Sequence, residues 1–169
     1  MKYEQAQTII QGLIKLSDAE KRGPLARIRR GAVPEHFFDA AGELLKICDD
    51  IHPGSLEITV AVAASFVSAC CEEGKTTLPQ AFARIAKGGG IDGVPLRFRL
   101  LLESSDENEL RDNLLNALAV LRREGIAINW TQLLFDAANW VISPETVANR
   151  WSQSYLFALR RTAEKRGES

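Results

Sequence analysis

Five cationic side chains fall within ten residues near the start of the sequence, in the stretch KRGPLARIRR (21–30). The four arginines of this stretch are Arg22, Arg27, Arg29 and Arg30. At 100° per residue they occupy an arc of about 160° on a helix, and the narrower opposite side carries Leu25 and Ile28. Guanidinium groups form paired hydrogen bonds that match the geometry of phosphate, so the pattern favours a phosphate-binding face. The alternative is a solvated helix whose arginines interact with the dipole at its carboxyl end.

Three of these arginines lack an acidic partner within the helix, which argues against that alternative. Arg27, Arg29 and Arg30 have no acidic residue four positions away, whereas Arg22 has Asp18. The second half of the chain adds five further candidates for phosphate contact: Arg97, Arg99, Arg111, Arg122 and Arg123. Arg122 and Arg123 end a predicted helix, where the dipole also explains them. Arg111 and Arg122 border a leucine stripe, where long side chains can also cover apolar surface.

Residues for other chemistry are sparse. The sequence has two histidines, and its three cysteines lack the CxxC spacing of a zinc site. It contains no GxSxG motif, and the glycine run at 88–90 lacks the GK[ST] ending of a phosphate-binding loop. We therefore expect no catalytic residue, no metal site and no cofactor, and hence a protein that is not an enzyme. The alternative of a small enzyme stays open, because catalytic residues that are distant in the sequence can lie together in the folded chain.

The net charge of −1 conceals an uneven distribution of charge. Residues 1–30 hold seven cations and three acids, a balance of +4, whereas residues 31–75 hold two cations and eight acids, a balance of −6. This excludes a general polyanion binder and predicts a local basic stripe. The longest apolar stretch, 58–71, is too short to span a membrane, and the first residues do not resemble a signal peptide. We expect a cytoplasmic protein with reduced thiols and no membrane contact.

Apolar residues recur at helical spacing almost everywhere, and no segment reads as a strand. The prediction is an all-α fold of about eight to nine helices in two small packed bundles, residues 1–90 and 91–169, although one compact domain is also compatible. Thr77 is expected to cap a helix, Ser104 and Glu107 to form a capping box, and Gly125 to end a helix. The glycine-rich segment 88–93 is expected to be a loop.

The order of motifs resembles the small subunit of the type I-E CRISPR surveillance complex Cascade, the CasB family. The stretches that carry the resemblance are LARIRRGAVPEHFF (25–38), TLPQAFARIAK (77–87), LRFRLLLESSDENELRDNLLNAL (96–118), NWTQLLFDAANW (129–140) and VANRWSQSYL (147–156). The resemblance implies an all-α, non-catalytic subunit in two copies beside the other Cascade subunits. It also implies support of the hybrid between guide RNA and target DNA, and of the displaced DNA strand.

By position, Arg29 and Arg30 match the arginine pair that the family carries before a proline, and Arg97 matches the arginine before a phenylalanine. The other five candidate arginines come from the helical faces alone. Where members often read SLGRALA this chain reads TLPQAFA, and two arginines of many members are replaced by Pro95 and Leu96. These departures remove cations. A different class of function, an all-α protein–protein adaptor whose arginines pair with acidic partners, stays open.

Overall fold

The computed structural model describes residues 1–86 and 95–167, so the predicted glycine loop lies outside the described residues. Within these ranges the regular structure is helical, apart from one isolated bridge between Thr76 and Ile128. The all-α prediction is confirmed. The elements are α1 (Tyr3–Asp18), α2 (Arg22–Arg30), η1 (Pro34–His36), α3 (Phe37–Ile47), η2 (Pro53–Ser55), α4 (Leu56–Ser68), α5 (Leu78–Ile85), α6 (Leu96–Leu102), α7 (Glu107–Arg123), α8 (Trp130–Trp140) and α9 (Pro144–Gly167).

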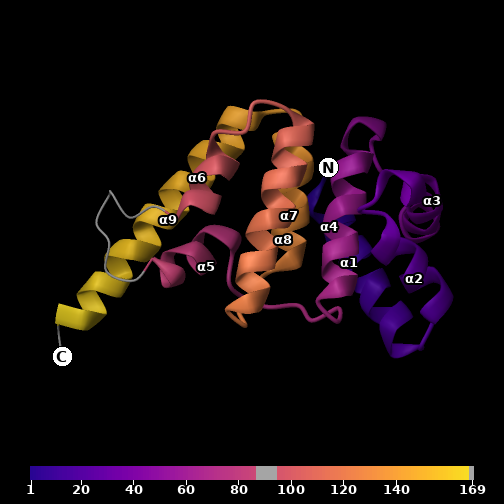
Figure 1. Cartoon of the computed structure of the whole chain (residues 1–169), viewed down its shortest axis with the longest axis horizontal. Coiled ribbons are helices and arrows are strands. Elements are labelled where there is room, and N and C mark those ends of the chain that lie inside the picture. The colour runs from indigo at the N-terminus through magenta and orange to yellow at the C-terminus, as the bar shows by residue number, and fades with distance from the viewer. Residues whose placement is uncertain (87–94, 168–169) are drawn as a thin grey trace.

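The helices form an elongated molecule (Figure 1). Helices α1 to α4 lie at one end, α5, α6 and α9 at the other, and α7 and α8 between them. Helix α8 packs against α1 and α4, and α9 packs along α5. The division at residue 90 stays a prediction, and α5, which precedes that position, lies against α9 of the C-terminal half.

One apolar core runs through both ends of the molecule. Helix α4 is buried on almost every side because its sequence, LEITVAVAASFVS, carries almost no charge. At the other end Phe98 of α6 is fully buried, with its ring 5.3 Å from that of Phe82 on α5 and 4.9 Å from that of Tyr155 on α9. Burial of Phe98 turns its two neighbours, Arg97 and Arg99, toward solvent.

Two of the three predicted helix-end features are confirmed and one is wrong. Thr77 is the N-cap of α5, and Gly125, with φ of 65°, follows the end of α7. At the start of α7 the cap is Asp106, whose Oδ1 accepts a hydrogen bond from the N–H of Glu109 at 2.9 Å. Ser104 instead donates to the carbonyl of Leu100, because α6 continues to Leu102 and leaves Ser104 just beyond its last turn.

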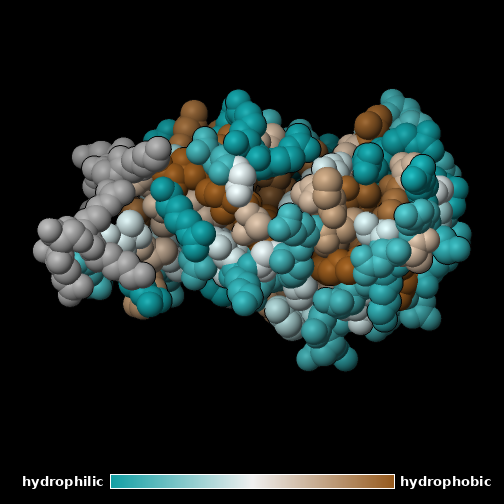
Figure 2. Space-filling model, turned by 90° about the horizontal axis from the view of Figure 1, so that it is seen from below, coloured by the Kyte–Doolittle hydropathy of each residue, from teal (hydrophilic) through white to brown (hydrophobic). Residues whose placement is uncertain are grey.

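The surface combines hydrophilic margins with apolar side chains in the middle of the face drawn in Figure 2. Two phenylalanines at opposite ends are well exposed, Phe38 of α3 at 85% and Phe157 of α9 at 62%. None of the helices in the described ranges has the length and apolar character needed to cross a membrane. In the same ranges, His, Cys, Asp and Glu side chains form no cluster of three or more with metal-binding geometry.

Candidate nucleic-acid interface

Helix α2 presents its arginines because its other side is fixed against the core. Ile28 is fully buried, and Gly31 directly after the helix lies against Ala40 of α3 and Val60 of α4. A Cβ at Gly31 would lie 2.3 Å from the Cβ of Ala40, so only glycine allows this approach. The close contact fixes the end of α2, and Arg29 and Arg30 extend from it into solvent. Neither forms an ion pair with any described residue.

Arg27, on the same helix, contacts a carboxylate of the protein itself. Its Nη2 lies 2.7 Å from Oε1 of Glu43 on α3, and its Nε donates to the same oxygen at 2.8 Å. Lys46 donates to that oxygen at 3.0 Å. Burial raises the pKa of Glu43, but hydrogen bonds from Lys46 and Arg27 outweigh it, and the pKa lies below its ordinary value. Arg27 therefore joins α2 to α3, and its guanidinium has fewer donors left for phosphate.

Arg27→Ala is expected to lower the free energy of unfolding by about 1–2 kcal/mol, because the nearly buried Glu43 loses both contacts from the guanidinium. The difference from wild type is expected to shrink at acid pH. A lowered pKa means that the pair stabilises the fold above the ordinary carboxyl pKa and loses this effect as the pH falls through the lowered one.

Chemical denaturation at several pH values measures this effect. The matched control is Arg30→Ala, which removes an exposed arginine from the same helix and is expected to change the unfolding free energy by less than about 0.5 kcal/mol. Equal destabilisation by the two variants would contradict a structural role for Arg27.

Arg111 is also engaged within the protein. Its guanidinium contacts the Glu57 carboxylate of α4 and, through Nε, the Asp112 carboxylate at 3.2 Å, and its side chain is only 22% exposed. Arg111 therefore ties α7 to α4. Glu107 lies close by, and burial together with the charge of Glu57 raises its pKa. The sequence pattern placed Arg111 on the same face as Arg122, but the two residues have different surroundings.

The short helix α6 presents Arg97 and Arg99 on its exposed side. Arg99 lies 3.9 Å from Glu103 one turn later, and both side chains are more than half exposed. Such a loose surface pair contributes little energy and does not prevent Arg99 from contacting phosphate. Arg97 has no ion pair among the described residues. Next to this helix, Pro79 of α5 is buried and Gln80 accepts a hydrogen bond from the Thr77 N–H, so these two departures from the family pattern serve the helix itself.

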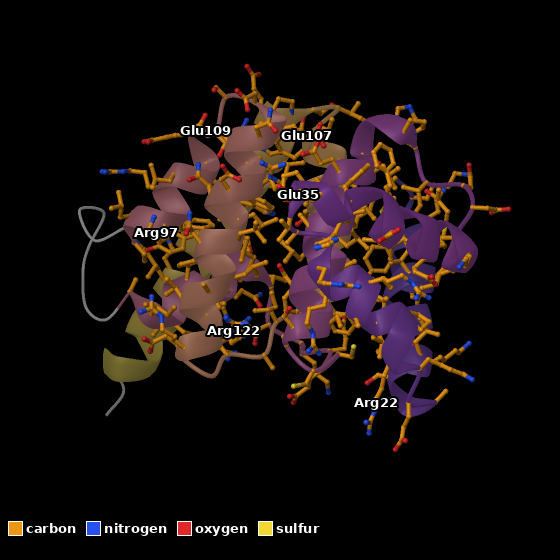
Figure 3. The ribbon with its side chains drawn as sticks, turned by 45° about the vertical axis from the view of Figure 1, so that its right-hand side comes forward. Arg22, Glu35, Arg97, Glu107, Glu109 and Arg122 are labelled. Atoms are coloured by element: carbon orange, nitrogen blue, oxygen red, sulfur yellow. The ribbon has the colours of Figure 1, made fainter. Side chains whose placement is uncertain are left out.

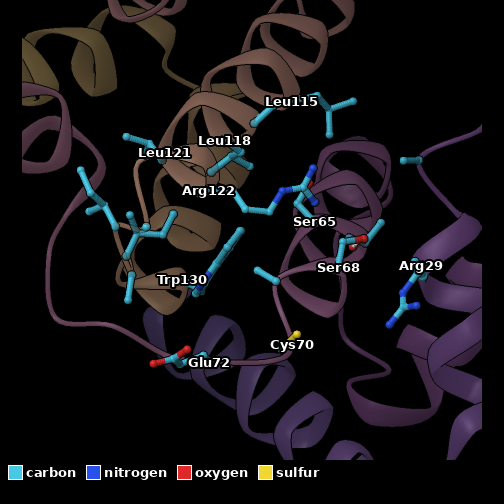
Figure 4. A pocket seen from close by; sticks show the side chains of 18 residues that line it. Arg29, Ser65, Ser68, Cys70, Glu72, Leu115, Leu118, Leu121, Arg122 and Trp130 are labelled. Atoms are coloured by element: carbon cyan, nitrogen blue, oxygen red, sulfur yellow. Dashed lines mark hydrogen bonds between the residues drawn. The ribbon is translucent and has the colours of Figure 1, made fainter. Parts of the chain in front are cut away.

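Arg122 and Arg123 lie in the last turn of α7, and both are exposed. Arg122 borders a groove of about 510 Å³ between α4 and α7, and Arg29 of α2 borders the same groove (Figure 4). Two arginines from distant parts of the sequence are thus brought to one opening. Sequence reasoning missed this groove, because its walls come from helices whose pairing no local pattern reveals.

Figure 3 shows how six of the charged side chains lie. Arg97 of α6, Arg122 of α7 and Arg22 of α2 follow a diagonal across this view, and Glu35, Glu107 and Glu109 lie above it. The described structure thus separates the eight candidate arginines into two sets. Arg27 and Arg111 form close ion pairs. The exposed set, with no close ion pair to a described residue, consists of Arg29, Arg30, Arg97, Arg99, Arg122 and Arg123.

The comparisons of this chain with family models and with solved structures agree on one family. A family model described as CRISPR-associated protein Cse2 matches residues 24–156, which is more than half of the chain. No curated protein matches the sequence.

Solved structures match over nearly the whole chain. A CRISPR-associated protein of the Cse2 family from Thermus thermophilus superimposes with a TM-score of 0.75 at 23% identity, over 89% of this chain and 97% of the other. A chain of a CRISPR RNA-guided surveillance complex matches with a TM-score of 0.75 at 23% identity, over 96% of each chain. CasB from Thermobifida fusca matches with a TM-score of 0.65 at 17% identity, over 92% of this chain and 98% of the other. At these identities the likeness shows a shared fold.

Proposed function

The chain belongs to the CRISPR-associated Cse2 family, and we propose that it is a non-catalytic subunit of an RNA-guided surveillance complex of the Cascade type. In this role it supports the hybrid of guide RNA and target DNA, and the displaced DNA strand, through contacts between arginine and phosphate. Its protein partners are the other subunits and a second copy of itself. The proposal rests on family membership together with the charges of the described surface.

The observation that carries the proposal is the exposed set of arginines, which comes from three separate helices. Arg29 of α2, Arg97 of α6 and Arg122 of α7 are exposed, and none forms an ion pair with a described residue. The whole chain has a net charge of −1, so these free cations form a local feature. Exposed guanidinium groups that no carboxylate of the described residues pairs are suited to phosphate oxygens of a partner.

Arginine–phosphate contacts are sufficient for this role. In RNA-guided recognition the sequence is read by base pairing, so a supporting protein needs no contact with base edges. Phosphate contacts position a strand without sequence preference and weaken as salt rises. The acidic segment 31–75 would limit binding to unrelated nucleic acid.

The proposal is tested with a Cascade core that lacks its small subunit. The purified chain is added, and affinity for target duplex is measured across a salt series. We expect the chain to co-migrate with the core and to tighten binding, with the gain decreasing as salt rises. Absence of co-migration together with unchanged affinity would contradict the proposal.

A protein–protein adaptor without nucleic-acid contact is the second candidate. It is favoured by the exposed rings of Phe38 and Phe157, which are suited to apolar pockets on partner proteins. Co-migration with the core without any change in affinity or salt dependence would support this candidate instead.

A further inference from the structure

The groove bordered by Arg29 and Arg122 combines apolar walls with polar edges. Its volume of about 510 Å³ lies within the range of ~300–1,000 Å³ that is usual for small-molecule sites. The apolar walls come mainly from α4, α7, the segment before α8 and the first residue of α8: Ala64, Leu115, Leu118, Ala119, Ile126 and Trp130. Figure 4 shows the Arg122 guanidinium above Ser65 and Arg29 across the opening.

The polar groups of the groove would recognise an anion and a hydrogen-bond donor in different places. Arg29 and Arg122 face the groove from two sides of its opening, and Glu72 lies at a third place on its rim (Figure 4). The hydroxyls of Ser65 and Ser68 donate to the carbonyls of Ala61 and Ala64, so their oxygens remain free to accept hydrogen bonds. A molecule that fits all of these groups carries negative charge, a flat apolar body and amino groups.

We propose that this groove holds one unpaired nucleotide, with its base between α4 and α7 and its phosphate against Arg29 and Arg122. This inference rests on the proposed function, because it takes the displaced DNA strand as the source of that nucleotide. Carboxylate and hydroxyl oxygens accept from the exocyclic amino groups of bases, and apolar surface covers the base itself.

Other occupants fit the groove less well. A DNA duplex or an RNA–DNA hybrid keeps its bases stacked, so it would contact the two arginines and leave the apolar walls empty. An apolar side chain of a neighbouring protein would fill the walls but leave two guanidinium groups without an anion. A single-stranded nucleotide matches the walls and the arginines at once.

Single abasic residues test whether a base is bound. The assembled complex is given target DNA with a pre-opened bubble, so that base loss in the displaced strand does not alter duplex melting. One abasic residue is then moved along that strand. We expect about fivefold weaker binding at one register for each copy of the chain, the lower end of what a base contact with a protein surface contributes. Uniform affinity at every register would overturn the inference.

Filling the groove is expected to abolish this sensitivity. Ala119→Leu adds apolar volume within the groove and leaves both arginines in place, and Ser68→Leu serves as a second variant should the first fail to fold. The matched control is Asn116→Leu, on the exposed side of the same helix and outside the groove. We expect the abasic effect to persist in the control and to vanish in the filled variants. Persistence in a folded, groove-filled complex would place the base elsewhere.

Cys70 gives a second, direct measurement, because it lies in the groove and is exposed. Its alkylation by iodoacetamide, measured by mass spectrometry, is expected to slow when target DNA is added to the assembled complex, whereas that of Cys48, outside the groove, is not. Protection of Cys70 before any DNA is added would show that another component of the complex already fills the groove and overturn the inference.

The arginine variants distinguish the two proposals. If the Arg29→Ala, Arg30→Ala chain weakens binding to target DNA but the wild-type complex shows no abasic effect, the nucleotide site is overturned and the phosphate role stands. Absence of both effects would overturn both.

Discussion

Asp136→Ala is expected to lower the free energy of unfolding by about 2–4 kcal/mol, a large part of the stability of a small domain. Asp136 of α8 is 5% exposed and accepts hydrogen bonds from Trp151 Nε1 at 2.8 Å, from Gln132 Nε2 at 2.8 Å and from Arg150 Nη2. Alanine would leave the fully buried Trp151 N–H without an acceptor and open a small cavity between α8 and α9. Urea denaturation of the isolated chain measures the loss.

The matched control is Asp136→Asn, which keeps the shape and one acceptor oxygen, so its loss is expected to be smaller. A comparison of wild type with Asp136→Asn also tests how the stability depends on pH. Burial raises the pKa of Asp136 above its ordinary 3.8, although hydrogen bonds and charge from Trp151, Arg150 and Gln132 act against the rise. A raised pKa means that the folded state holds the proton more tightly. Wild type should therefore gain stability relative to Asp136→Asn as the pH falls through the raised pKa toward 3.8. A constant difference across this range would contradict the argument.

The fold followed from the sequence where the signal was local. The spacing of leucines in α7, the threonine before α5 and the glycine after α7 each act within one or two turns, and their elements lie where they were expected. The cap of α7 was misassigned because Ser104 and Asp106 are both good caps, and the actual end of α6 decided between them.

The candidate site was less accessible to sequence reasoning, for a physical reason. Arg27 was judged free because it has no acid one turn away, yet its partner Glu43 lies sixteen residues further on, across a helix–helix contact. The partner of Arg111, Glu57, lies 54 residues away. Ion pairs between helices depend on which helices pack together, and periodicity describes only one helix at a time. The separation of structural from free arginines therefore required the tertiary structure.

That separation shows how one residue type serves two roles in this protein. A guanidinium that pairs with a half-buried or buried carboxylate is held in place and contributes to stability, as with Arg27 and Arg111. A guanidinium on an exposed helix end, such as Arg30, contributes little to stability and remains free for a partner. Substitutions in the two sets should thus give opposite results, with lost stability in one and lost affinity in the other.

The double substitution Arg29→Ala, Arg30→Ala is expected to weaken binding of the assembled complex to target DNA roughly ten- to thirtyfold at physiological salt. Two lost phosphate contacts account for this magnitude, because each contact releases about one counterion from the DNA. The dependence of log K on log salt should become shallower by about one to two units. The fold should be unaffected, because the apolar side of α2 and the contact at Gly31 are untouched.

The informative control for this prediction is Arg29→Lys, Arg30→Lys. Lysine keeps the charge but not the planar fork, so the salt dependence should stay near that of wild type while affinity falls less than with alanine. A steep salt dependence that survives in the alanine variant would assign the phosphate contacts to other arginines of the exposed set. Unchanged affinity at physiological salt would remove Arg29 and Arg30 from the interface. Arginine–phosphate contacts at the end of α2 require the affinity for target DNA to rise from the alanine variant through the lysine variant to wild type. They also require that only the alanine variant shows a shallower dependence of log K on log salt.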